Sequence, residues 1–227
     1  MRLRHAARVS RKNAPAPDLV APLRAAHLYV ITAEAPPSRV IEVAASALRG
    51  GAEVLQLRHK SLARGELLAL GLKLRAITKD SGALFIVNDH VDIAMLSHAD
   101  GVHLGPNDLS IASARRIAGD HLLIGASASS PDAARAAIAQ GADYLGSGPA
   151  FATPIKTEKQ VIGPKGVAAI AAAVGPGVPV FAIGGIDETN VAQLIAEGLR
   201  RVCVIRAVSD APDPEQAARR LRAMLND

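Results

Sequence analysis

Three polar side chains alternate along one short segment, Gln56-Leu57-Arg58-His59-Lys60. Alternate residues of a β-strand lie on the same face, so Gln56, Arg58 and Lys60 would all point to one side if a strand ends here. An amide, a guanidinium and an ammonium group make a poor core but a good anion site. The segment therefore predicts an anion clamp, the alternative being a strand end whose charges are only solvated.

Two carboxylates follow two further strand-like runs. Asn88 and Asp89 come directly after LFIV, and Asp108 comes shortly after GVHL. Mg²⁺ is usually held by one or two protein carboxylates, with water and substrate phosphates completing its shell. Each aspartate could instead cap the helix that follows it. Beside a cationic strand, Asp89 and Asp108 are better interpreted as magnesium ligands.

Hydroxyl and lysine side chains occur after the fifth and sixth strand-like runs. Ser127 ends LLIGAS, and the long connection PAFATPIKTEKQVIGP carries Thr153 and Lys156. A small hydroxyl and a cation in such a loop suit closure over a phosphate group. By contrast, His103 in GVHLG is interpreted as a packed strand residue, and the single cysteine, Cys203, as core.

The last two strand-like runs end in residues suited to a second anion. Gly184-Gly185 follows VPVFAI, and Ile205-Arg206 ends VCVIR. Glycine leaves backbone N–H groups accessible, and such groups bind phosphate. These positions predict a glycine-rich anion subsite, separate from the clamp and the paired carboxylates.

Eight strand-like runs alternate with Ala-rich amphipathic stretches, repeating about every 25 residues, as a (β/α)₈ barrel requires. The predicted strands are His27–Thr32, Val54–Arg58, Leu84–Asn88, Gly101–Leu104, Leu122–Ser127, Tyr144–Gly148, Val178–Gly184 and Val202–Arg206. The predicted helices lie around 39–49, 65–81, 91–98, 110–118, 131–140, 166–174, 189–197 and 214–225.

The structural alternative is a doubly wound open sheet. Such a sheet often carries a Gly-rich phosphate loop after its first strand, whereas ITAEAPPSR follows the first strand here. We therefore predict a single (β/α)₈ TIM barrel over 26–227. The active site of this fold lies at the carboxyl ends of the strands, where the candidate residues are found.

Composition excludes several classes of protein. Aromatic residues make up only 2 % of the 227, too few for the stacking platforms of single-stranded nucleic-acid binding. The segment 1–25 holds six of the 26 Lys and Arg residues and one of the 21 acidic residues, which leaves 20 of each elsewhere. The basicity therefore belongs to this segment, predicted to be a disordered extension. With no apolar run of roughly 20 residues, we expect a cytoplasmic protein with small-molecule partners, no nucleic acid and no membrane.

A series of motifs resembles thiamine phosphate synthase. They run in order over about residues 28–208: LYVIT, GGAEVLQLRHK, FIVNDHVDIA, ADGVHLGPNDL, LIGAS, GADYLGSGPAFAT and VPVFAIGGIDETNV. That family joins a pyrimidine diphosphate to a thiazole phosphate and releases pyrophosphate. The resemblance implies a dissociative mechanism, in which pyrophosphate leaves first and the thiazole nitrogen captures a pyrimidine-methyl cation. Relatives suggest a monomer or a homodimer.

The resemblance also implies a role for each matched residue. The pyrimidine diphosphate would be held by Gln56, Arg58, Lys60 and Asn88, with Ser127 on the pyrimidine and Lys156 on the pyrophosphate. Asp89 and Asp108 would bind Mg²⁺, and Arg58, Lys60 and Lys156 would be the catalytic residues. The thiazole phosphate would contact Thr153 and Gly184, with Gly185, Ile205 and Arg206 in the same substrate-binding set.

Three positions depart from the family pattern. The motif Thr-x-Thr-Lys reads Thr153-Pro154-Ile155-Lys156, a serine expected near the end of the eighth strand is Arg206, and a histidine expected two residues after Ser127 is Ser129. The diphosphate subsite is thus intact, while the thiazole-phosphate subsite is altered. Three alternatives stay open: a related synthase with a different acceptor, a thiazole tautomerase and a non-catalytic phosphate-ligand-binding barrel.

Overall fold

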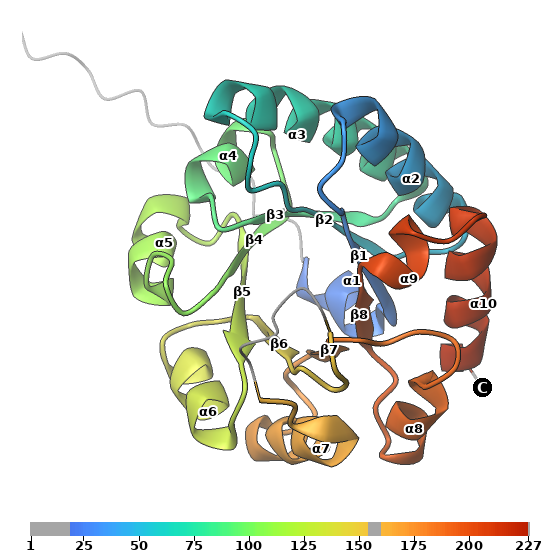
Figure 1. The fold of residues 1–227 in the computed structure, drawn as a ribbon. Coiled ribbons are helices and arrows are strands. Elements are labelled where there is room, and N and C mark those ends of the chain that lie inside the picture. Colours follow the sequence, from blue (N-terminus) through green and yellow to red (C-terminus); the bar gives the residue numbers. More distant parts are fainter. Residues whose placement is uncertain (1–18, 154–159, 227) are drawn as a thin grey trace, which may run out of the picture.

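Eight parallel strands close into a barrel in the computed structural model, which describes residues 19–153 and 160–226 (Figure 1). Each strand pairs with its neighbour in sequence, and β1 pairs with β8. This closure excludes the open sheet. The strands are β1 (Leu28–Ile31), β2 (Val54–Leu57), β3 (Leu84–Asn88), β4 (Gly101–Leu104), β5 (Leu123–Ala128), β6 (Tyr144–Ser147), β7 (Val180–Ile183) and β8 (Val202–Val204).

Helices surround the barrel, and all eight predicted helices are present (Figure 1). They are α2 (Pro37–Arg49), α3 (Arg64–Ser81), α4 (Val91–Leu96), α5 (Ile111–Ala118), α6 (Pro131–Ala139), α7 (Gly163–Val174), α8 (Val191–Ala196) and α10 (Pro214–Asn226). Among the described residues, two further short helices were not predicted, α1 (Val20–Ala25) and α9 (Arg206–Ser209). None of the helices in the described ranges is long and apolar enough to cross a membrane.

The alternation of each strand divides the buried residues into two cores. Outward residues such as Leu28 and Val30 pack against the helices, whereas Tyr29 and Ile31 belong to a separate cluster inside the barrel. The inner cluster holds three of the chain's five aromatic residues, Tyr29, Tyr144 and Phe181. Tyr29 and Phe181 meet edge to face with ring centroids 5.3 Å apart, an arrangement that aromatic pairs favour.

Helix α1 corrects the predicted boundary of the N-terminal extension. The disordered segment was expected to reach residue 25, but Val20–Ala25 is helical and Leu23 is fully buried in the inner cluster. Arg201 donates to the Arg24 carbonyl at 2.6 Å. The amino ends of the strands carry inner apolar side chains that must be covered from water, and α1 provides that cover. Residues 1–18 lie outside the described part of the chain.

The eighth strand is shorter than predicted. β8 ends at Val204, and Arg206, expected to end the strand, begins α9. The N–H of Ser209 donates to the carbonyl of Ile205 at 2.9 Å, and that of Asp210 to the carbonyl of Arg206 at 3.0 Å. These two bonds close a single helical turn, which takes the place of further strand pairing.

An acidic residue directly precedes three of the strands. Glu53 accepts the N–H groups of His27 and Leu28, Asp100 that of Phe85, and Asp143 that of Ile124. Each carboxylate also pairs with an arginine from a helix. Glu53 pairs with Arg222 at 2.7 Å, Asp100 with Arg75 at 2.7 Å and Asp143 with Arg115 at 2.6 Å. Through these hydrogen bonds the acids link β2 to β1, β4 to β3 and β6 to β5.

Candidate active site

A cavity of about 720 Å³ runs from the carboxyl ends of the strands into the interior of the barrel. Its deep part is lined by Tyr29, Tyr144, Phe181 and Cys203. Of the thirteen predicted site residues, twelve line this one cavity: Gln56, Arg58, Lys60, Asn88, Asp89, Asp108, Ser127, Thr153, Gly184, Gly185, Ile205 and Arg206. The thirteenth, Lys156, lies outside the described residues.

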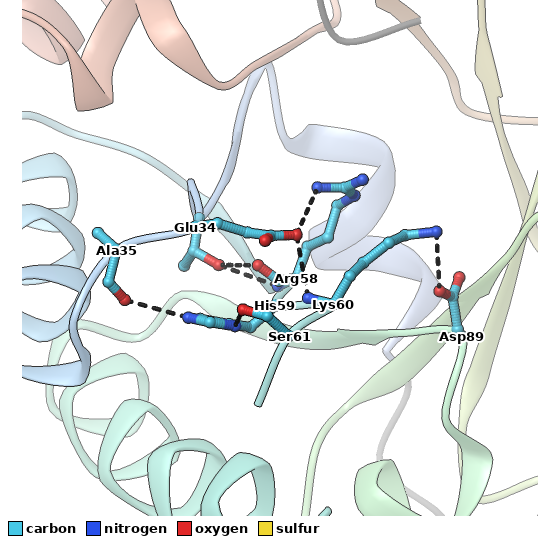
Figure 2. A network of polar contacts seen from close by, with 8 residues as sticks. Glu34, Ala35, Arg58, His59, Lys60, Ser61 and Asp89 are labelled. Carbon is cyan, nitrogen blue, oxygen red and sulfur yellow. Dashed lines mark hydrogen bonds and ion pairs between the residues drawn. The ribbon is translucent and has the colours of Figure 1, made fainter. Parts of the chain in front are cut away.

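Arg58 and Lys60 stand at the end of β2, each beside a carboxylate from a neighbouring segment (Figure 2). Arg58 Nη1 is 3.8 Å from Glu34 Oε1, and Lys60 Nζ is 3.7 Å from Asp89 Oδ2. Both distances exceed those of a normal N–H···O hydrogen bond. An anion that enters the cavity can therefore compete with the carboxylates for both cations.

The segment after β1 holds the backbone of this clamp. The Thr32 hydroxyl donates to the Arg58 carbonyl at 3.0 Å and accepts from the Arg58 N–H at 2.9 Å. Glu34 Oε1 accepts from the Lys60 N–H at 3.1 Å. Sequence reasoning missed Glu34, because no local pattern shows that the β1–α2 connection lies against the end of β2.

Asp89 and Asp108 do not cap the helices that follow them. The N-cap of α4 is His90, with no side-chain cap, and the N-cap of α5 is Ser110, whose hydroxyl accepts from the Ser113 N–H at 3.1 Å. Asp108 instead accepts from the Gly105 N–H at 2.8 Å within its own turn. The capping interpretation is therefore wrong for both aspartates.

The two aspartates lie in contact, and this affects the protonation of Asp89. Burial, together with the hydrogen bond and charge of Asp108, raises the pKa of Asp89 above its ordinary value, while Lys60 and His90 oppose the rise. In the described ranges no group of three or more His, Cys, Asp or Glu residues could hold a metal ion. A pair of carboxylates nevertheless fits Mg²⁺, which needs only one or two from the protein.

Gln56 is the most buried polar residue of the site. Its side chain is 2 % exposed, and its Nε2 donates to the Tyr29 hydroxyl at 2.7 Å. Tyr29 and Tyr144 are joined through their hydroxyls at 3.1 Å, and burial raises the pKa of each, so both stay neutral. The Oε1 of Gln56 is buried with no partner in the described chain. A ligand N–H would satisfy this acceptor.

His103 lines the cavity, a position that its interpretation as a packed strand residue did not predict. Its Nε2 lies 3.1 Å from Ser127 Oγ. Its ring centroid is 5.6 Å from that of Tyr144. The alternation of residues along β4 could have indicated this position, because it places His103 on the inner face of the barrel. Gly105, two residues further on, also lines the cavity.

Gly184 and Gly185 allow the segment after β6 to pack closely on the end of β7. Their φ angles are +103° and +63°, where glycine is favoured. A Cβ at Gly184 would lie 2.6 Å from the Pro149 Cα, and one at Gly185 would lie 2.4 Å from the Ala152 carbonyl oxygen. This close approach brings Thr153 to the cavity.

Arg206 supplies positive charge on the β6–β8 side of the cavity. Among the described lining residues of that side, it is the only lysine or arginine. Its Nε lies 3.0 Å from Asp210 Oδ2, and both side chains are more than half exposed. The guanidinium is therefore accessible to an anion at the mouth.

Comparison with known proteins identifies the family. A family model described as thiamine monophosphate synthase matches residues 28–208. A thiamine-phosphate synthase from Moorella thermoacetica is 47 % identical over 82 % of this chain and 88 % of its own length. One from Gloeobacter violaceus is 45 % identical over 87 % of this chain, which spans 57 % of that longer protein.

Solved structures agree with this match. The thiamine phosphate pyrophosphorylase from Pyrococcus furiosus superposes with a TM-score of 0.82 at 38 % identity, covering 90 % of this chain and 97 % of its own. A 3-hexulose-6-phosphate synthase has a TM-score of 0.64 at 18 % identity and shares the fold alone. On the family model and these relatives, the chain belongs to the thiamine monophosphate synthase family.

Proposed function

We propose that this protein is a transferase that couples a pyrimidine diphosphate to a thiazole phosphate, giving thiamine phosphate and pyrophosphate. Family membership supports this activity. The observation that carries it is a single cavity with a cationic clamp and paired carboxylates on one side and Arg206 on the other. Such a cavity suits two phosphorylated substrates that must meet.

The β2–β4 side would bind the diphosphate. Arg58 and Lys60 would hold its oxygens and stabilise the negative charge that grows as the bond between the pyrimidine methylene carbon and the diphosphate oxygen breaks. The electron pair of that bond leaves with pyrophosphate. Asp89 and Asp108, with Asn88 beside them, would hold Mg²⁺, whose positive charge would neutralise further charge on the diphosphate.

The interior of the barrel would bind the pyrimidine ring. The buried Oε1 of Gln56 would accept a hydrogen bond from the amino group of the ring, which supplies the missing partner. His103 and Ser127 line the same part of the cavity and would contact the ring from the β4–β5 side. The aromatic side chains that line the interior would help to keep water away from the reactive pyrimidine-methyl cation.

The β6–β8 side would bind the acceptor. Thr153, Gly184, Gly185 and Ile205 line this side, and Arg206 stands at its mouth. A guanidinium binds phosphate through two parallel hydrogen bonds, so Arg206 could take the place of the serine expected there. Once pyrophosphate has left, the lone pair of the thiazole nitrogen would form the new bond to the carbon of the pyrimidine-methyl cation.

Pyrophosphate release tests the proposal. The purified protein is given the pyrimidine diphosphate and Mg²⁺, with and without thiazole phosphate. We expect release that depends on thiazole phosphate, with thiamine phosphate formed in equal amount, and at least about a hundredfold loss of rate in Asp108→Ala. Binding of the diphosphate without thiazole-dependent release would contradict the proposed acceptor. A cytoplasmic location and a homodimer stay predictions.

A further inference from the structure

We infer that Glu34 weakens the binding of pyrophosphate, because its carboxylate competes with the bound anion for the guanidinium of Arg58. This inference rests on the proposed function, in that it takes the clamp at the end of β2 to be the diphosphate subsite. It assigns to Glu34 a role in setting how readily the polyanionic product leaves. Neither the family motifs nor the sequence patterns assign Glu34 any role.

The geometry of Glu34 is that of a displaceable counter-ion. Its Oε1 lies 3.8 Å from Arg58 Nη1, too far for a hydrogen bond, so the pair is held by charge alone (Figure 2). The Arg58 side chain is 19 % exposed and that of Glu34 is 41 % exposed. Arg58 is among the described residues that line the cavity and Glu34 is not. Glu34 therefore acts on the site through Arg58.

The backbone of the clamp is anchored without the charge of Glu34. The Thr32 hydroxyl makes two hydrogen bonds to the backbone of Arg58, and His59 Nε2 lies 3.1 Å from the Ala35 carbonyl oxygen. Glu34 adds a third link through the Lys60 N–H. A glutamine can accept that same N–H, so Glu34→Gln removes the negative charge and leaves the backbone contacts in place.

The counter-ion of Lys60 differs from that of Arg58. Lys60 faces Asp89, whose carboxylate is in contact with Asp108 and belongs to the proposed magnesium pair. A cation bound there would offset the charge of Asp89. Glu34 stands apart from that pair, so its negative charge persists when the site is filled and repels a bound polyanion. Repulsion between the Glu34 carboxylate and bound pyrophosphate, over several ångströms near the surface, corresponds to about a threefold to tenfold change in the affinity for pyrophosphate.

Binding of inorganic pyrophosphate tests this role directly. Isothermal titration calorimetry with Mg²⁺ at low ionic strength compares the wild-type protein with Glu34→Gln. We expect the variant to bind pyrophosphate about three to ten times more tightly, and the difference to shrink in high salt because screening weakens surface charge. The matched control is Glu42→Gln, which removes an exposed carboxylate on α2 that pairs with Arg39. It is expected to bind like the wild type.

The outcomes separate this inference from the proposed function. If the wild-type protein does not bind pyrophosphate, the diphosphate subsite itself is wrong. If the wild type binds and Glu34→Gln binds equally or more weakly, the role of Glu34 is wrong while the subsite stands. In turnover, product inhibition by pyrophosphate should strengthen by the same factor, with a lower KM for the pyrimidine diphosphate. A purely structural role would instead lower the melting temperature without tightening binding.

Discussion

Two features of Asp89 lower the stability of the folded protein, and its place in the site explains both. Its backbone has φ +64°, a region that Asp and Asn tolerate better than most residues, and its carboxylate is half-buried beside Asp108. Burial and Asp108 raise the pKa of Asp89, so the folded protein binds the proton more tightly than the unfolded chain does. Ionised Asp89 therefore destabilises the folded state at neutral pH, and a cation would relieve that cost.

Asp89→Asn is expected to raise the melting temperature at pH 7 in metal-free buffer. Asparagine suits the positive φ and removes the half-buried charge. Thermal denaturation should show the advantage fading as the pH falls through the raised pKa, because the wild-type carboxyl becomes protonated and neutral there. Mg²⁺ should stabilise the wild type and have no effect on the variant. Asp120→Asn, at an exposed position, serves as control; an equal rise there would contradict the explanation.

The barrel elements are joined at their amino ends by one repeated contact. Glu53, Asp100 and Asp143 each precede an even-numbered strand and bind the backbone of the strand before it. The fourth equivalent position is Arg201, whose side chain instead donates to the Arg24 carbonyl in α1. Acidic residues therefore link the strands β1 to β6 in three pairs. Beside the last pair, β7 and β8, the contact is made to α1 instead.

Asp143→Ala is expected to lower the free energy of unfolding by about 1–3 kcal/mol, since it removes both a backbone N–H contact and the partner of Arg115. Urea denaturation measures this change. Asp132→Ala, in which the lost carboxylate is 92 % exposed on α6, should cost less than about 0.5 kcal/mol. Equal losses in the two variants would show that the strand contact contributes nothing specific.

Across the whole molecule, barrel closure brings opposite ends of the chain to one cavity. The clamp of Arg58 and Lys60 comes from the segment directly after β2, and Arg206 comes from the helical turn after β8. Because β1 pairs with both β2 and β8, the diphosphate and acceptor sides stand on either side of that strand. The two sides can therefore be altered separately.

Arg206→Ala is expected to raise the KM for thiazole phosphate by about tenfold to a hundredfold, the loss of one charge-assisted contact. Pyrophosphate binding should stay within about twofold of the wild type, because Arg58 and Lys60 remain. Steady-state kinetics and calorimetry measure the two effects. Asp210→Asn, which frees the guanidinium of its partner, should lower the same KM. An unchanged KM in both variants would remove Arg206 from the acceptor subsite.

The sequence by itself determined the barrel, its strand order and twelve of the residues that line its cavity. Alternation along each strand identified the inward positions Gln56, Arg58 and Lys60, and the strand ends identified Asp89 and Asp108, because these patterns arise between neighbours in the chain. Only the tertiary structure decided the contacts between separate segments. It placed Glu34 beside Arg58, Leu23 beneath the barrel and Arg206 on a helical turn. Such contacts depend on the path each connection takes when distant surfaces pack, and no local pattern encodes that path.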